Sequence, residues 1–133
     1  MLEELTDQLG LQQHVRFLGR LPNHEVLDHM AHAFAVVVNS HVETFSVVTG
    51  EALAQGKPVV ATRCGGPQAF VTDQNGLLIP PGDDAALCDA MLTLCANADR
   101  YDPAVIRRSV SASFSTEAVG RAFQMVYERA LHA

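Results

Sequence analysis

Short apolar runs alternate with helical segments through most of this 133-residue chain, and this order constrains the fold more than any other feature. Residues 34–38, 58–61 and 77–79 are dominated by Val, Ala, Leu and Ile, which is typical of strands buried on both faces. Residues 15–18 have the same character and predict a further strand. Strands that alternate with helices are joined by right-handed crossovers and form a parallel sheet. The sequence therefore predicts an α/β fold, a parallel sheet with flanking helices.

Helices are predicted between and after these strands from apolar spacing and from capping residues. The first helix carries Leu2, Leu5 and Leu9 on one stripe and stops at Gly10. Residues 46–55 form a helix that ends at Gly56. Four more helices are expected to start at Asn23, Asp83, Pro103 and Ser115. The first has Val26, Leu27 and Met30 inward, and the second has Leu87, Met91, Leu94 and Cys95 on one face. The last carries a stripe of Val119, Phe123, Val126 and Ala130, with Phe114 and Val119 placed as a hydrophobic staple. The chain beyond residue 82 is thus wholly helical.

Charge and cysteine content exclude several classes of protein. The formal net charge is −6, which disfavours a general nucleic-acid binder and an anionic membrane surface. No apolar run approaches the roughly 20 residues of a transmembrane segment. The three cysteines are too few and too scattered for a disulfide framework. Cys88 and Cys95 fit packing positions, and a cytoplasmic setting is the default expectation.

Two loops follow predicted strands at the edge where open parallel sheets bind ligands. Residues 39–46 follow the predicted strand at 34–38, and residues 62–67 follow the one at 58–61. Both loops run into helix N-termini, where free amides and the helix dipole favour an anion. Gly65 and Gly66 permit close approach of backbone to a ligand, although a tight turn would explain them as well.

Glu43 and Glu51 frame the first loop, one before the helix and one about a turn inside it. A carboxylate at the second position fits a vicinal diol such as a ribose, and one at the first fits sugar hydroxyls. The amides between them fit a diphosphate. Spacing alone favours a simpler interpretation, in which both are exposed acids that complement the helix N-terminus. The weak helix formers Val47, Val48, Thr49 and Gly50 shift the balance toward function.

Three segments then carry a resemblance to a known family: the block 43–62 (ETFSVVTGEALAQGKPVVAT), Gly65-Gly66-Pro67, and 75–83 (NGLLIPPGD). Together they closely resemble the group 1 family of retaining glycosyltransferases, over nearly the whole chain from residue 15 to residue 115. The resemblance implies a GT-B fold, with two Rossmann-like domains that face each other across a cleft. The C-terminal domain binds the nucleotide-sugar donor, such as a UDP-, GDP- or ADP-sugar, and the N-terminal domain binds the acceptor.

The resemblance also implies roles for single residues. Glu43 would contact the donor sugar as the catalytic residue, and Glu51 would bind the ribose. Backbone amides would meet the sugar and the diphosphate, and the nucleobase would lie near the end of the predicted strand 15–18. The family is metal-independent and needs no cofactor. The implied donor-binding set is Glu43, Thr44, Phe45, Ser46, Val47, Glu51, Arg20, Leu21, Gly65 and Gly66.

Departures from the family pattern set a second group of expectations. An arginine and a lysine that grip the diphosphate, two central strands and the acceptor domain have no counterpart here. We therefore expect residues 1–133 to be one partial domain that depends on a missing N-terminal domain or a partner chain, through which it could associate with a membrane. Ser46 replaces a common glycine but keeps its amide and can cap the helix. Gly50 replaces an apolar residue, and Gln68 stands where a glutamate is common.

The sequence supports three functional hypotheses. The first is the donor-binding half of a retaining glycosyltransferase of polysaccharide or glycoconjugate biosynthesis, inactive as an isolated fragment, with an unknown acceptor. The second is a non-catalytic, truncated or partner-dependent α/β module with residual nucleotide-sugar binding. The third is another GT-B enzyme, such as a nucleotide-sugar epimerase. A metal site is not expected, because His29 and His32 have ligand spacing but no third ligand.

Overall fold

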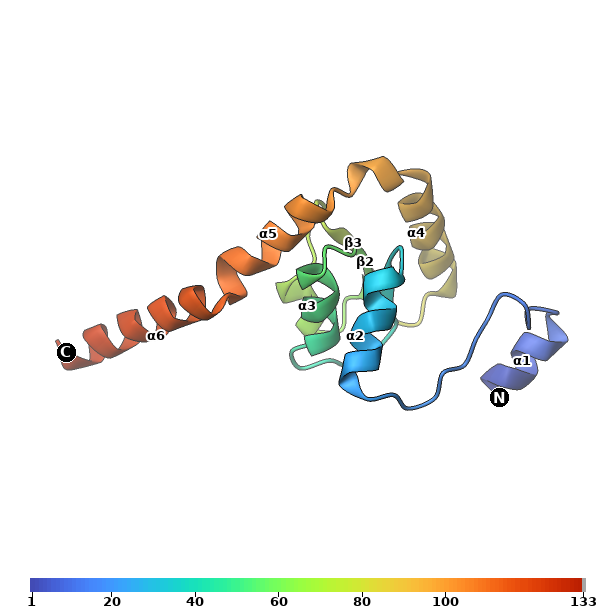
Figure 1. Ribbon diagram of the computed structural model, residues 1–133, viewed down its shortest axis with the longest axis horizontal. Helices are drawn as coiled ribbons and strands as arrows, with labels where there is room; N and C mark the ends of the chain where they lie inside the picture. The colour runs from blue at the N-terminus through green and yellow to red at the C-terminus, as the bar shows by residue number, and fades with distance from the viewer. Residues whose placement is uncertain (133) are drawn as a thin grey trace.

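Three parallel strands form the centre of the structure, a computed structural model that describes residues 1–132 (Figure 1). Helices precede, separate and follow them. In chain order the elements are α1 (Leu2–Gln8), α2 (Asn23–His32), β1 (Val36–Val38), α3 (Val47–Ala54), β2 (Val59–Thr62), the 3₁₀ turn η1 (Gly66–Ala69), β3 (Gly76–Ile79), α4 (Asp84–Ala96), the 3₁₀ turn η2 (Ala98–Arg100), α5 (Pro103–Phe114) and α6 (Thr116–Leu131).

The sheet has the order β1-β2-β3, and both pairings are parallel. Val37 lies opposite Val60, which in turn lies opposite Leu77. The predicted α/β fold with a parallel sheet is confirmed. Because parallel strands end at the same edge, the loops after β1 and β2 emerge side by side, as the candidate site requires.

The core surrounds β2, in which all four residues are buried. Helix α3 packs on β1 and β2, and α4 packs on β2 and β3, to either side of the strands in Figure 1. Leu53 from α3, Leu94 from α4 and Ile106 from α5 are fully enclosed. The middle strand is thus covered on both faces, as its uninterrupted apolar sequence predicts.

The predicted strand at residues 15–18 is not formed. Its side chains are exposed, with Phe17 at 46% and Leu18 at 38%. A strand exists only where a neighbouring strand accepts its hydrogen bonds, and among residues 1–132 no strand lies beside this segment. The strand predicted there from apolar character alone is therefore wrong.

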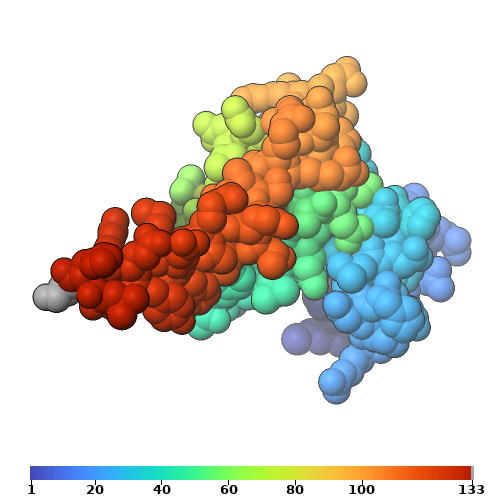
Figure 2. Space-filling view, turned by 60° about the vertical axis from the view of Figure 1, so that its left-hand side comes forward, coloured from blue at the N-terminus to red at the C-terminus, as the bar shows by residue number. Residues whose placement is uncertain are grey.

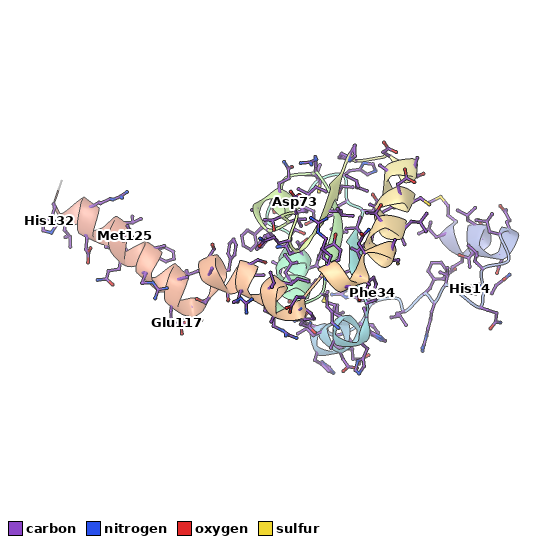
Figure 3. The ribbon with its side chains drawn as sticks, turned by 90° about the horizontal axis from the view of Figure 1, so that it is seen from above. His14, Phe34, Asp73, Glu117, Met125 and His132 are labelled. Carbon is purple, nitrogen blue, oxygen red and sulfur yellow. The ribbon has the colours of Figure 1, made fainter. Side chains whose placement is uncertain are left out.

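The first strand of the sheet is also shorter and less buried than predicted. β1 covers only residues 36–38, and Val37 is 42% exposed. Phe34 lies before the strand and is exposed as well (Figure 3). β1 is an edge strand, so the prediction that it is buried on both faces was wrong.

Helix ends follow the capping signals in most places. Asp83 accepts a hydrogen bond from the amide of Ala86 at 2.8 Å, and Ser115 accepts one from the amide of Ala118 at 3.2 Å. Asn23 is an exception, because it is the first residue of α2 and Pro22 occupies the N-cap position. The α2 face is as predicted, with Met30 buried and Val26 and Leu27 packed on the core.

The buried face of α4 differs from the prediction. Ala90 and Leu94 are buried, whereas Met91 is exposed. Cys88 and Cys95 are exposed too, so neither is a packing residue. The buried face is narrower than the apolar spacing suggests, because α4 packs mainly on the strip formed by β2 and β3.

The last helix leaves the body of the molecule. Figures 1 and 2 show α6 extending beyond the other elements, and none of its residues is buried. The predicted apolar stripe is present, but Phe123 is 58% exposed and Val126 is 60% exposed.

Candidate functional site

The two candidate loops are joined through backbone hydrogen bonds. The amide of Glu43 donates to the carbonyl of Cys64 at 3.1 Å, and the amide of Gly66 donates to the carbonyl of Glu43 at 2.7 Å. Glu43 and Gly65 form an isolated parallel bridge. The structure therefore brings three predicted site residues, Glu43, Gly65 and Gly66, into one small unit at the carboxyl edge of the sheet.

Glycine is required at both positions of this joint. Gly65 has a φ of +114°, and a Cβ there would lie 2.5 Å from the carbonyl oxygen of Glu43. A Cβ on Gly66 would lie 2.5 Å from the carbonyl carbon of Phe45. Any side chain would push the loops apart, so the tight-turn explanation of the glycine pair holds whether or not a ligand binds here.

The loop presents a run of free backbone amides. Within residues 1–132, no amide of residues 44–48 donates a hydrogen bond to the protein, and the run leads into the first turn of α3. Ser46 has φ 63° and ψ 64°, a left-handed conformation of the kind found where successive amides form an anion-binding nest. The loop thus places unbonded amide donors at a helix N-terminus, an arrangement that can interact favourably with an anion.

Ser46 occupies the N-cap position of α3 but does not cap it with its side chain. Its hydroxyl oxygen lies 2.8 Å from that of Thr49, and Ser46 is buried. The expectation that the serine hydroxyl caps the helix is thus corrected. The left-handed backbone turns that hydroxyl toward the Thr49 side chain and leaves the loop amides free.

The Glu43 carboxylate is held at the rim of this loop. Ser40 donates a hydrogen bond to Glu43 Oε1 at 2.9 Å, and the carbonyl of Ser40 accepts a hydrogen bond from the Thr62 hydroxyl at the end of β2. Neither Ser40 nor Thr62 was named from the sequence as a site residue. The placement of Ser40 three residues before Glu43, in the same loop, is a signal that could have identified it.

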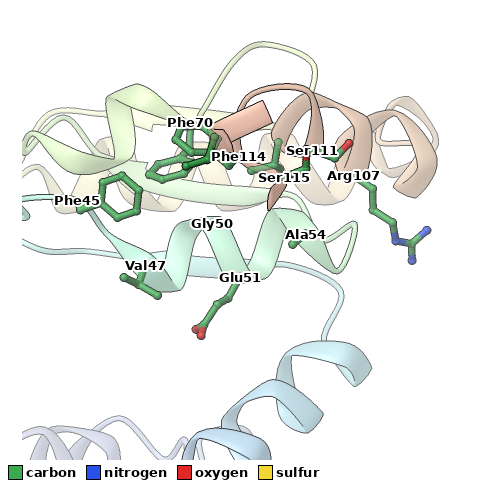
Figure 4. A pocket seen from close by; sticks show the side chains of 12 residues that line it. Phe45, Val47, Gly50, Glu51, Ala54, Phe70, Arg107, Ser111, Phe114 and Ser115 are labelled. Atoms are coloured by element: carbon green, nitrogen blue, oxygen red, sulfur yellow. The ribbon is translucent and has the colours of Figure 1, made fainter. Parts of the chain in front are cut away.

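Glu51 lies within α3 and is half-buried. Its carboxylate forms no hydrogen bond or ion pair within residues 1–132. Figure 4 shows it pointing away from Phe70 and Phe114. It is therefore an unengaged acceptor on the helix that begins at the amide run.

Arg20 and Leu21 lie in the linker before α2, and no hydrogen bond or ion pair within residues 1–132 joins them to either glutamate. Gln68, the departure from the family pattern, uses its side-chain oxygen to accept a hydrogen bond from the Gly65 amide at 3.2 Å. That side chain therefore stabilises the glycine turn.

An open hollow of about 710 Å³ lies between α3 and the junction of α5 and α6 (Figure 4). Its walls are mainly apolar and aromatic, and they include Phe45, Phe70 and Phe114. Arg107 stands at its edge and donates a hydrogen bond to the carbonyl of Gln55. Phe70 and Phe114 were not singled out as site residues from the sequence, since nothing in their spacing links them.

The described part of the chain holds neither a cluster of metal ligands nor a helix suited to a membrane. No three His, Cys, Asp or Glu side chains of residues 1–132 gather closely enough to hold a metal ion. None of the helices described here has the length and apolar character needed to cross a bilayer.

Comparison with known proteins decides the family. The profile of the group 1 glycosyl transferases matches residues 1–97. The chain belongs to this family. A D-inositol 3-phosphate glycosyltransferase of Corynebacterium urealyticum is 42% identical over 100 residues, 74% of this chain and 24% of that protein. The lipopolysaccharide core biosynthesis glycosyltransferase LpsD of Rhizobium meliloti is 33% identical, with 96% of this chain and 38% of that protein covered.

Solved structures show the same fold for this group 1 glycosyltransferase chain. A sucrose-phosphate synthase from Thermosynechococcus elongatus matches 98% of this chain and 34% of its own, with 30% identity and a TM-score of 0.83. Anabaena Alr3699/HepE, solved in complex with UDP, matches 99% and 36%, with 27% identity and a TM-score of 0.78. The strands and helices are those of the C-terminal, Rossmann-like half of a GT-B fold. The chain spans about a quarter to two fifths of the curated relatives that it matches.

Proposed function

We propose that this chain supplies most of the donor-binding half of a glycosyltransferase that transfers a sugar from a nucleotide sugar with retention of configuration. The observation that carries the proposal is the free amide run at residues 44–48, beside the Glu43 carboxylate and in front of α3. A neighbour with 27% identity binds UDP, which has the diphosphate that such a run fits.

The amide run suits a diphosphate for electrostatic reasons. Each hydrogen bond from a backbone amide to a charged oxygen contributes about 1.5–3 kcal/mol, and the dipole of α3 adds to it. Within the run, the amides proposed to contact the donor are those of Thr44, Phe45, Ser46 and Val47. In the proposed complex they hold the diphosphate and sugar, and the same donors stabilise the leaving diphosphate during transfer.

Carboxylates orient the two ends of the donor in this proposal. Glu43, fixed by Ser40, accepts hydrogen bonds from the sugar hydroxyls near the reacting carbon. Glu51 accepts a bidentate pair from the ribose diol, and the base lies toward Arg20 and Leu21. Retention follows if the acceptor attacks on the face from which the diphosphate leaves. In this proposal the acceptor is bound by a part of the enzyme outside the region that this chain shares with its relatives.

The second candidate, a partner-dependent module with residual nucleotide-sugar binding, is favoured by a separate observation. The segment at residues 15–18 and the stripe of α6 both leave apolar side chains uncovered. On this alternative the chain binds the donor but does not turn it over by itself. Release of free nucleotide from a donor sugar by this chain alone, abolished in Glu43→Ala, would argue against it.

A two-dimensional amide spectrum of the chain with UDP, GDP and ADP tests the proposal, with Glu51→Ala as the matched variant. We expect the amide signals of residues 44–48 to move with one nucleotide, and the shifts to weaken in the variant. A dispersed spectrum whose signals do not shift with any of the three nucleotides would contradict donor binding by this chain.

A further inference from the structure

Three phenylalanines from separate elements form one cluster beside the amide run (Figure 4). Phe45 belongs to the loop, Phe70 follows η1, and Phe114 is the last residue of α5. The ring centroids of Phe70 and Phe114 are 4.6 Å apart, and Phe45 lies 5.0 Å from Phe70 and 6.1 Å from Phe114. Both contacts of Phe45 are edge-on, the arrangement that aromatic pairs prefer.

Phe45 is held from two sides. Its backbone rests on Gly66, where no side chain would fit, and its ring rests on Phe70 and Phe114. The same residue contributes one of the free amides of residues 44–48. The direction of those amides therefore depends on where the ring of Phe45 is fixed.

The first turn of α3 is shaped to admit Phe70. A Cβ on Gly50 would lie 3.3 Å from Cε1 of Phe70, tighter than an ordinary van der Waals contact. Phe70 is buried, whereas Phe45 and Phe114 remain partly exposed on the hollow. The missing side chain at Gly50 thus seats the ring on which Phe45 rests.

Phe114 links the cluster to the junction of two helices. The next residue, Ser115, is extended, with φ −69° and ψ 157°, and it caps α6. Phe114 thus occupies the position at which the chain turns from α5 into α6. A movement of this junction displaces a ring that contacts Phe45.

We propose that Phe70 and Phe114 are positioning residues for the anion-binding loop, holding Phe45 so that the amides of residues 44–48 converge on one ligand. This inference rests on the proposed donor site and adds two residues that contact no ligand themselves. Loss of one ring contact is expected to weaken loop binding by up to about tenfold, the upper value for a favourable aromatic pair.

The first test needs no ligand. Phe114→Leu keeps an apolar side chain but removes the ring. The control, Phe123→Ala, removes a phenylalanine of α6 that lies outside the cluster and stacks on Tyr127. Exchange of the Gly66 amide, which is bonded to Glu43, reports on the loop joint. In Phe114→Leu we expect faster exchange of the Gly66 amide and shifted signals for residues 44–48. We expect wild-type behaviour in Phe123→Ala and recovery in Phe114→Trp.

The second test uses UDP and inorganic pyrophosphate as probes of the same three variants. Binding about two- to tenfold weaker in Phe114→Leu but unchanged in Phe123→Ala supports the inference. A wild-type chain that binds neither probe refutes the donor site, while the exchange measurement still decides whether the rings position the loop. Phe114→Leu identical to Phe123→Ala in exchange and in signal positions overturns the inference.

Discussion

The middle of the molecule buries its apolar side chains, whereas the two ends leave theirs exposed. Residues 36–110 enclose theirs around β2 and tie two loops together through Glu43 and Gly66. Helices α1 and α6 bury no residue at all, although both carry apolar stripes. The sequence pattern is similar in the two regions, so the difference lies in whether another element covers the stripe.

The buried core and the candidate site thus lie in the same region of the molecule. The candidate loop follows β1 and is joined by backbone contacts to the loop after the buried strand β2, so it is anchored next to the core. The ends add exposed apolar area without adding core contacts.

Removal of a large apolar side chain is expected to give the largest difference. Leu53 is fully buried in α3, and Leu53→Ala should lower the free energy of unfolding by about 3 kcal/mol through lost burial and a cavity. Phe123→Ala in α6 should change it by less than about 0.5 kcal/mol. Urea unfolding followed by circular dichroism measures both. Equal losses would show that α6 belongs to the cooperative core.

Replacement of glycine by alanine is expected to lower stability in the middle of the molecule and to raise it in α6. Gly66→Ala forces a Cβ against the Phe45 backbone and should cost about 2 kcal/mol, with loss of any UDP response. Gly120→Ala in α6 meets nothing within 4 Å and should stabilise that helix by about 1 kcal/mol. Thermal melts and helical ellipticity report the two effects. A harmless Gly66→Ala would mean that the two loops can separate without loss of fold.

Loss of a helix cap is a smaller change and tests the comparison with matched chemistry. Asp83 caps α4, which packs on the sheet, so Asp83→Ala should cost about 1 kcal/mol of global stability. Ser115 caps α6, and Ser115→Ala should fray that helix while the global unfolding midpoint stays in place. Residue-resolved amide exchange separates fraying from global unfolding. A shifted midpoint in Ser115→Ala would contradict the independence of α6.

Local signals predicted what depends on neighbours in the sequence. The strand after Pro58, the helix stop at Gly56 and the cap at Asp83 are each determined by adjacent residues, and the structure confirms them. Residues 15–18 carry an equally good strand pattern but form none, since pairing requires a partner strand that no local pattern specifies.

The site divides along the same line. The sequence indicated the loop of Glu43 and the glycine pair separately, as two loops that each follow a predicted strand. Their union through the bridge from Glu43 to Gly65 is a tertiary contact, and so is the packing of Phe70 on Phe114. The roles of Glu43, Glu51 and the loop amides stay predictions, which the nucleotide titrations address.

The smallest expected effect on folding concerns the exposed stripe of α6. Val126 is 60% exposed, so Val126→Glu should leave the free energy of unfolding within about 0.5 kcal/mol of the wild type. Contiguous exposed apolar surface promotes association, so the charge should reduce self-association and binding of a hydrophobic dye. Sedimentation velocity and dye fluorescence measure these properties, with Glu128→Gln, a charge change on the same helix, as control. A stability loss of several kcal/mol in Val126→Glu would show that α6 folds back onto the body in solution, and the contrast between the middle and the ends would fail.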